Sequence, residues 1–156
     1  MPVDTLIIVP SRHRPHNVER LINSWRATTD GTSELLICLD EDDADNYSIP
    51  GDVSVLVRPR MRLGDWWNYA ATNYHSHNDI RFMGFLGDDN TFGTSDWEKK
   101  ITEPLRDRIG ISYGNDQYHG VNLCTSAVLS VEIIEVLGYA CPPKQIHLFL
   151  DNFWMA

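Results

Sequence analysis

The sequence has few cysteines and no long apolar run, and both shortages limit what the protein can be. Three widely spaced cysteines occur among 156 residues, and no two stand at the spacing of a zinc site. We therefore expect free thiols in the core and a reducing compartment, by default the cytoplasm. No apolar segment approaches the ~18 residues of a membrane span, and no basic stretch followed by an apolar one opens the chain. The sequence predicts neither a span nor a signal peptide.

Positive charge is also scarce. The chain carries 13 Lys and Arg against 22 Asp and Glu, a formal net charge of -9. This balance argues against a broad surface that binds nucleic-acid phosphates, so an anionic ligand must be held by a local group of arginines. With 42% hydrophobic residues, the length fits one globular domain with a substantial core.

The order of the apolar segments predicts an α/β domain. Strands are expected over residues 4–10, 34–40, 53–58, 80–86 and 109–113, and helices over 16–28, 63–75, 96–108 and 131–137. Ser130 is a candidate N-cap of the last helix, and Gly138 follows its end. Strands that alternate with helices form a mostly parallel central sheet flanked by crossover helices. The aromatic-rich ending "DNFWMA" suggests a truncated or minimal version of a longer chain.

Charged residues follow several of the predicted strands. Ligands of open α/β sheets bind beyond the carboxyl ends of the strands, so these residues are expected to form one rim. It comprises Ser11, Arg12 and Arg14; Asp40; Arg58, Arg60 and Arg62; and Asp88, Asp89 and Asn90. Arginines suit a diphosphate, and carboxylates suit a divalent cation that bridges its oxygens. The pattern predicts a site for a nucleoside diphosphate with a metal ion.

A series of motifs carries a family resemblance. "LIIVPSRHRP", "LLICLDEDD", "RLGDWWNYA", "FMGFLGDDNTF" and "TSAVLSVEIIEVLGY" occur in this order and are followed by "HLFLDNFW". Together they resemble the GT-A-fold glycosyltransferases of the family 2 type, over nearly the whole chain. The resemblance implies a single GT-A domain over 1–156, with the nucleotide-binding half at about 1–90 and the acceptor side at about 91–156.

The resemblance also implies roles for individual residues. Asp89, in a DXD-like motif, would bind Mn²⁺ or Mg²⁺ directly, and Asp88 would contact the ribose or the metal. Asp151 is the candidate catalytic base, and the alternative for it is a helix N-cap. The remaining nucleotide-sugar contacts are expected from Pro10, Ser11, Arg12, Arg14, Asp40, Arg62 and Asn68.

Other residues have plainer interpretations. The acidic segment with Asp42, Asp43 and Asp45 is interpreted as a solvated loop. One of Trp66 and Trp67 is expected to face the core, which leaves the other for stacking on a sugar. His119 and His147 are weaker candidates for auxiliary metal ligands.

These features lead to one main functional hypothesis. The chain is predicted to be a metal-dependent, inverting glycosyltransferase that transfers a sugar to an unknown hydroxyl acceptor. The predicted donor is a UDP-sugar, and a GDP-sugar is the second choice. A nucleotidyltransferase is the enzymatic alternative, although the loop after the first strand lacks the glycines that such enzymes use around phosphates. A binding module that holds a nucleotide sugar without turnover is the alternative from another class.

Overall fold

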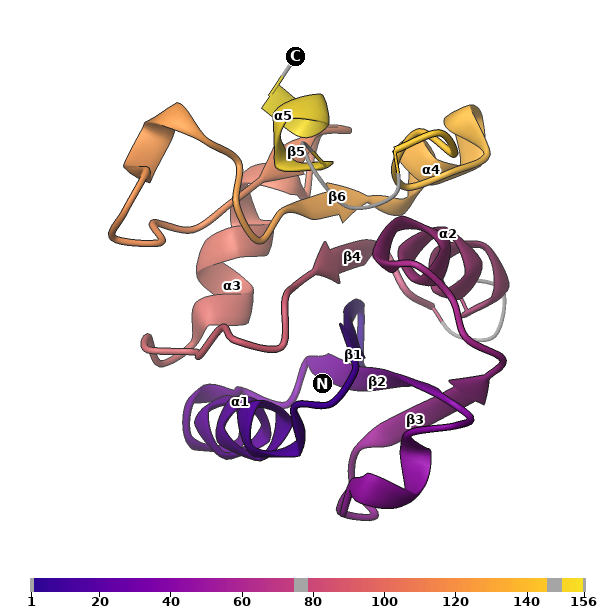
Figure 1. Ribbon diagram of the computed structural model, residues 1–156. Helices are drawn as coiled ribbons and strands as arrows, with labels where there is room; N and C mark the ends of the chain where they lie inside the picture. The colour runs from indigo at the N-terminus through magenta and orange to yellow at the C-terminus, as the bar shows by residue number, and fades with distance from the viewer. Residues whose placement is uncertain (1, 75–78, 146–149, 156) are drawn as a thin grey trace.

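The computed structural model describes residues 2–74, 79–145 and 150–155. Six strands form one sheet in the order β3-β2-β1-β4-β6-β5 (Figure 1). Their bounds are Thr5–Ser11 (β1), Ser33–Asp40 (β2), Ser54–Arg58 (β3), Phe82–Phe85 (β4), Ile111–Ser112 (β5) and Val128–Ser130 (β6). Strands β1 to β4 run parallel, whereas β6 runs antiparallel to both β4 and β5. The prediction of a mostly parallel α/β sheet is therefore confirmed.

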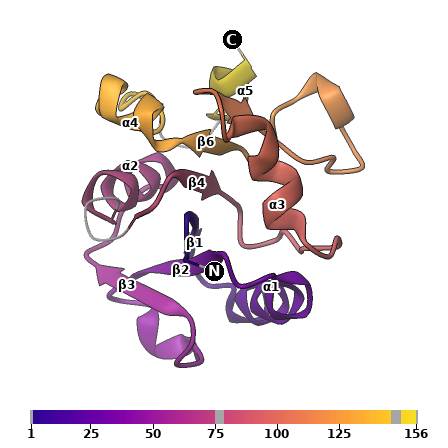
Figure 2. The ribbon, with the colours of Figure 1, turned by 180° about the vertical axis from the view of Figure 1, so that it is seen from behind.

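Helices cover both faces of this sheet. They are α1 (Pro15–Thr28), α2 (Leu63–Tyr74), α3 (Trp97–Thr102), α4 (Val131–Leu137) and α5 (Leu150–Met155), with 3₁₀ turns at Ala44–Asn46, Glu103–Leu105 and Gly120–Asn122. Seen from the front and from behind, α1 and α3 lie on one side of the sheet, and α2 and α4 on the other (Figures 1 and 2).

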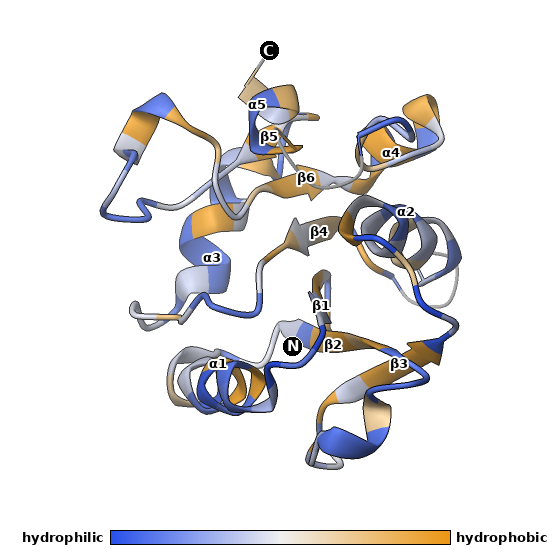
Figure 3. Ribbon diagram, viewed as in Figure 1, coloured by the Kyte–Doolittle hydropathy of each residue, from blue (hydrophilic) through white to orange (hydrophobic). Residues whose placement is uncertain are grey.

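Alternation along the strands explains why both faces are apolar. Ile7 of β1 packs in the cluster that includes α1, whereas Leu6 and Ile8 pack in the cluster that includes α2, α4 and α5. Successive side chains of a strand point to opposite faces, so a strand buried on both sides reads as one continuous apolar run. Hydrophobic colour accordingly runs along the strands, while α1 is mixed around its circumference (Figure 3).

Two strands depart from the sequence prediction. Strand β6 was not expected, because its three residues directly precede the equally apolar α4 and the two elements read as one segment. Pro10 lies within β1, where a strand end was predicted. The β1–β4 pairing stops at Ile8 opposite Phe85, so at Pro10 the strand pairs only with β2, and proline is tolerated at such a strand edge.

The helices after the acidic motif are shorter than predicted or capped differently. A single helix was expected over 96–108, but α3 ends at Thr102 and a 3₁₀ turn containing Pro104 follows, since proline removes a helical hydrogen bond. Gly138 ends α4 with a positive φ of 76°, as predicted. Ser130 is at the N-cap position, but its hydroxyl accepts a hydrogen bond from the Gly110 N–H and makes no cap bond.

The helices also bear on the membrane prediction. No described helix combines the length and the apolar character that crossing a bilayer requires.

Candidate nucleotide-sugar site

A cavity of about 630 Å³ opens where the chain leaves β1, β2 and β4. The strand order reverses between β1 and β4, which is the position where open α/β sheets bind ligands. Ten of its residues come from the three strand exits: Pro10, Ser11, Arg12, Arg14, Asp40, Phe85, Gly87, Asp88, Asp89 and Asn90. Four more come from the start of α2 and the loop before it: Met61, Leu63, Trp66 and Trp67. Asp116, Thr125, Ser126, Leu150 and Asp151 complete the wall.

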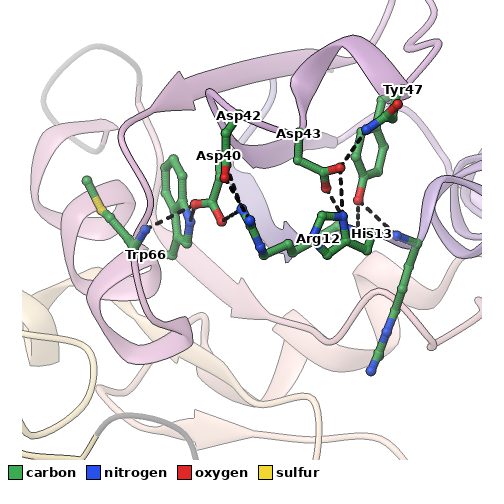
Figure 4. A network of polar contacts seen from close by, with 11 residues as sticks. Arg12, His13, Asp40, Asp42, Asp43, Tyr47 and Trp66 are labelled. Carbon is green, nitrogen blue, oxygen red and sulfur yellow. Dashed lines mark hydrogen bonds and ion pairs between the residues drawn. The ribbon is translucent and has the colours of Figure 1, made fainter.

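Asp40 is a buried carboxylate that several neighbours hold in place (Figure 4). It is 2% exposed and accepts hydrogen bonds from Arg12 Nη1 at 2.8 Å, from the Met61 N–H at 3.1 Å and from Trp66 Nε1 at 3.0 Å. These bonds tie the exit of β2 to the exit of β1 and to the start of α2. Asp40 therefore fixes the shape of this end of the cavity as well as lining it.

Arg12 is held by two carboxylates. Besides Asp40, it donates two hydrogen bonds to Asp42, at 2.6 and 2.7 Å. A bidentate contact of this kind suits the planar guanidinium group. The shared hydrogen bonds and opposite charges raise the pKa of Arg12 and lower the pKa of Asp42 to about 2. Arg12 is thus a fixed cation at the cavity wall.

The acidic segment after β2 is less solvated than expected. Asp43 is 1% exposed and accepts hydrogen bonds from the His13 N–H at 2.6 Å and from Asn46 Nδ2 at 2.8 Å, with His13 Nδ1 at 3.0 Å (Figure 4). The interpretation as a solvated loop is therefore wrong for Asp43, although Asp42 and Asp45 are exposed. Asp43 thus holds the loop after β1 through His13, which has a positive φ of 57°.

Asp88 and Asp89 differ sharply in their surroundings. Asp88 is buried and accepts hydrogen bonds from Ser11 Oγ at 2.6 Å and Arg14 Nη1 at 3.2 Å. Asp89 is exposed, and its carboxylate has only a long contact of 3.5 Å, with Asn90 Nδ2. Asp88 is therefore a positioned group, whereas Asp89 has most of its oxygen lone pairs available.

The donor set of these two residues suits a hard cation. Carboxylate oxygens are the preferred protein ligands of Mg²⁺, which commonly takes only one or two from the protein and the rest from phosphates and water. Within the described residues, no group of three or more His, Cys, Asp or Glu side chains is gathered for a metal. The pair fits a cation that arrives with a diphosphate better than a metal held by protein ligands alone.

Asp151 enters the cavity from the opposite side to Asp40. It lies in the first turn of α5, one residue after the helix begins at Leu150, and so is not the N-cap that the alternative interpretation required. It is half-buried, and burial is the main cause that raises the pKa of its carboxyl group; His119 lowers that pKa and Asp116 raises it further. A carboxylate with a raised pKa inside a cavity is a candidate general base.

The cavity brings together eight of the ten predicted site residues. They are Pro10, Ser11, Arg12, Arg14, Asp40, Asp88, Asp89 and Asp151. Arg62 and Asn68 are not among the cavity-lining residues. Arg62 pairs with Asp65 at 2.7 Å on the helix surface, and Asn68 binds the backbone of residues 140 and 141. Their predicted nucleotide contacts therefore have no support in the geometry.

Of the two weaker metal candidates, only His119 lies within the described residues. His119 is 56% exposed and contacts Asp116 at 2.8 Å, and His147 lies outside the described residues. Both tryptophans of α2 are buried and line the cavity, so the expected division into one core and one sugar-stacking residue does not hold.

Several cavity residues were not predicted. Tyr47 Oη lies 3.0 Å from Ser11 Oγ and accepts a hydrogen bond from the Arg14 N–H, so it supports the loop after β1 from outside the cavity. Thr125 and Ser126 enter through the segment before β6. Thr125 and Ser126 begin the quoted motif "TSAVLSVEIIEVLGY", but no site role was predicted for them or for Tyr47.

Several solved structures have a similar fold. One is a mannosyltransferase from Pyrobaculum calidifontis in complex with GDP-Man and Mn²⁺, with a TM-score of 0.68, 14% identity and coverage of 97% of this chain. The chain has the GT-A fold. Residues 1–349 of TarS from S. aureus in complex with UDP-GlcNAc give a TM-score of 0.67 at 12% identity and cover 98% of the chain.

The chain spans only about half the length of these two structures, 52% of the mannosyltransferase and 52% of the TarS fragment. No protein-family model and no curated protein match the sequence significantly. The likeness is therefore one of fold, and the cavity's own residues must support any function.

Proposed function

We propose that the chain is a glycosyltransferase that binds a nucleoside-diphosphate sugar in this cavity and transfers the sugar, with inversion, to a hydroxyl acceptor. The observation that carries the proposal is the gathering of three kinds of group around one cavity of about 630 Å³. Fixed guanidinium groups, an acidic pair and a separate half-buried carboxylate are what the three parts of this reaction need.

The nucleoside is assigned to the end formed by Arg12, Asp40 and Met61. Asp40 accepts three hydrogen bonds already, and a carboxylate has about four acceptor positions, so one remains for a base N–H. UDP is the first expectation and GDP the second. The neighbouring structures hold GDP-Man in one case and UDP-GlcNAc in the other, so both nucleotides belong in the test.

The diphosphate is assigned to the exit of β4. Asp89 would hold the cation, with Asp88 positioned beside it by Ser11 and Arg14. A bound Mn²⁺ or Mg²⁺ would supply positive charge against the charge that develops on the leaving diphosphate. Arg14 lies next to Asp88 at the cavity wall and adds a positive charge of its own.

Asp151 is assigned the proton transfer. As the acceptor oxygen attacks the anomeric carbon, a carboxylate oxygen of Asp151 takes the hydroxyl proton, and the bond from that carbon to the diphosphate oxygen breaks. The new bond forms on the face opposite the leaving group, which inverts the configuration. Asp151 suits this step because it is separate from the acidic pair, and a carboxylate that ligates a metal is a weaker base.

The test uses the purified chain with UDP- and GDP-sugars. We expect calorimetric titration to show nucleotide binding that depends on Mn²⁺, and we expect slow release of the nucleoside diphosphate from the sugar nucleotide into water. Binding without release would favour a binding module. Release of pyrophosphate from a nucleoside triphosphate would favour a nucleotidyltransferase. A chain that binds no nucleotide with or without Mn²⁺ would refute the proposal.

A further inference from the structure

Two buried polar atoms of cavity-lining residues have no hydrogen-bond partner among the described residues. Among the described residues, the buried side-chain nitrogen and oxygen atoms without a hydrogen bond are Nε1 of Trp67 and Trp97, Oγ1 of Thr125 and Oε1 of Gln145. Trp67 and Thr125 line the cavity, whereas Trp97 and Gln145 do not. Buried polar groups are rarely left unpaired, and an exception calls for an explanation.

The sequence neighbours of these two residues are paired. Trp66, adjacent in sequence to Trp67, donates its indole N–H to Asp40 at 3.0 Å. Ser126, adjacent to Thr125, donates to Asn90 Oδ1 at 3.1 Å. The two unpaired atoms therefore stand out against partnered neighbours of the same chemical types, which points to a partner that arrives with a ligand.

Sheet order and ring contacts relate both residues to β4, β6 and α5. Thr125 precedes β6, which in the sheet order is separated from β2 and its Asp40 by β1 and β4. Trp67 packs against Phe85 of β4 and Trp154 of α5, with ring centroids 5.7 and 5.5 Å apart. The aromatic cluster thus holds the indole ring against β4, which leads to the acidic pair, and against α5, which carries Asp151.

We propose that Trp67 Nε1 and Thr125 Oγ1 form the specificity subsite for the hydroxyl groups of the transferred sugar. The inference rests on the proposed function, which places the sugar beyond the diphosphate. An indole N–H can only donate, and a threonine hydroxyl can donate and accept. A sugar hydroxyl can both donate and accept a hydrogen bond, so it can pair with the Trp67 indole N–H and with the Thr125 hydroxyl. Both atoms are covered in the free chain, and the bonds form as the side chains adjust to the entering sugar.

The experiment compares a nucleoside diphosphate with its sugar derivatives. The probes are UDP, UDP-glucose, UDP-N-acetylglucosamine, GDP and GDP-mannose, titrated with Mn²⁺ into the parent, Trp67→Phe and Thr125→Val. Phenylalanine keeps an aromatic ring but lacks the N–H, and valine keeps the shape of threonine but lacks the hydroxyl. At least one sugar nucleotide is expected to bind roughly 3- to 10-fold more weakly to each variant, while the parent's affinity for UDP and GDP is retained.

Two controls separate a sugar contact from a structural role. Trp66→Phe removes an indole N–H that is paired with Asp40, so it is expected to weaken UDP and UDP-sugars by the same factor. Thr125→Val removes an atom that has no hydrogen-bond partner in the described part of the chain, so the melting temperature of this variant is expected to equal or exceed that of the parent. If Trp67→Phe does not fold, Thr125→Val alone decides the outcome.

The outcomes distinguish this inference from the proposed function. If UDP and GDP bind the parent but no sugar nucleotide is weakened selectively in either variant, the subsite is wrong and the proposed function stands. If neither nucleotide binds the parent, the proposed function fails and the subsite falls with it. Selective loss for one sugar nucleotide supports the subsite and identifies the preferred sugar among those tested.

Discussion

Replacing Asp40 with asparagine tests how far the cavity depends on one buried carboxylate. Its Oδ1 accepts hydrogen bonds from the Met61 N–H and Trp66 Nε1, and its Oδ2 accepts from Arg12 Nη1. Asparagine can keep the first two bonds through its amide oxygen. Its NH₂ group must then face the Arg12 guanidinium, so a donor opposes a donor where an attractive charged hydrogen bond existed.

The size of the effect follows from these contacts. A hydrogen bond to a charged group contributes about 1.5–3 kcal/mol. Arg12 keeps its two bonds to Asp42, at 2.6 and 2.7 Å, so the guanidinium is not left unpaired and the lower half of that range, about 1.5–2 kcal/mol, applies to the free energy of unfolding. For a chain of this size, each kcal/mol lowers the melting temperature by roughly 2–4 °C, which gives a decrease of about 3–8 °C.

Thermal unfolding followed by circular dichroism measures this decrease, and UDP titration measures the accompanying loss of affinity, expected at about 1–3 kcal/mol. Asp42→Asn is the matched control, because Asp42 contacts the same guanidinium but is 58% exposed, and exposed ion pairs contribute only about 0.2–1 kcal/mol. Equal melting temperatures for Asp40→Asn and Asp42→Asn would refute the reasoning. Equal UDP affinities of Asp40→Asn and the parent would place the nucleoside elsewhere.

The remaining predictions concern the metal, the base and one glycine. Asp89→Ala is expected to abolish Mn²⁺-dependent UDP binding in calorimetry. It is expected to leave the chain folded, because the Asp89 side chain is exposed. Asp88→Ala is expected to weaken UDP binding less but to lower the melting temperature, because the Asp88 carboxylate is buried. Asp151→Asn is expected to reduce transfer by ~100-fold or more with UDP binding near that of the parent, and unchanged turnover would remove this residue from the mechanism. Since burial raises the pKa of Asp151, kcat/KM is expected to fall as the pH decreases through a value above the ~3.9 of a free aspartate; a pH profile without this decrease would contradict the assignment. Gly64→Ala would place a Cβ 2.6 Å from the Gln145 carbonyl oxygen. The free energy of unfolding, measured by urea denaturation, is therefore expected to fall by about 1–3 kcal/mol. A urea midpoint equal to that of the parent would show that α2 shifts freely to make room.

The fold was largely predictable, because a strand buried on both faces and an amphipathic helix leave different patterns in the sequence. Helix α1 has its buried residues at helical spacing, and β1 and β2 are nearly continuous apolar runs. Prediction failed at β6, a strand of three residues that leads directly into α4. Short elements carry too few residues for a period to be read.

The acidic pair, Asp88 and Asp89, shows how far the site could be predicted from the sequence. "FLGDDN" marks a ligand-binding edge, but the letters do not say that Asp88 is buried beneath Ser11 and Arg14 while Asp89 is exposed. The same limit explains why Asp43 was interpreted as solvated and why Asn68 was assigned to the nucleotide. A hydrogen bond between residues 30 or 70 positions apart depends on the tertiary contact, and no local pattern encodes it.

The sequence by itself determined the α/β class, the mostly parallel sheet, the free cysteines and the edge where charged residues gather, because each follows from local composition and from the period of the apolar residues. Only the tertiary structure decided which of those charged residues face one cavity, and it alone brought Thr125 and Asp151 to the wall opposite Asp40. The physical reason is that a parallel sheet aligns strand ends from distant parts of the chain. The partners of each polar group, and the two cavity-lining atoms left without one, follow from that alignment.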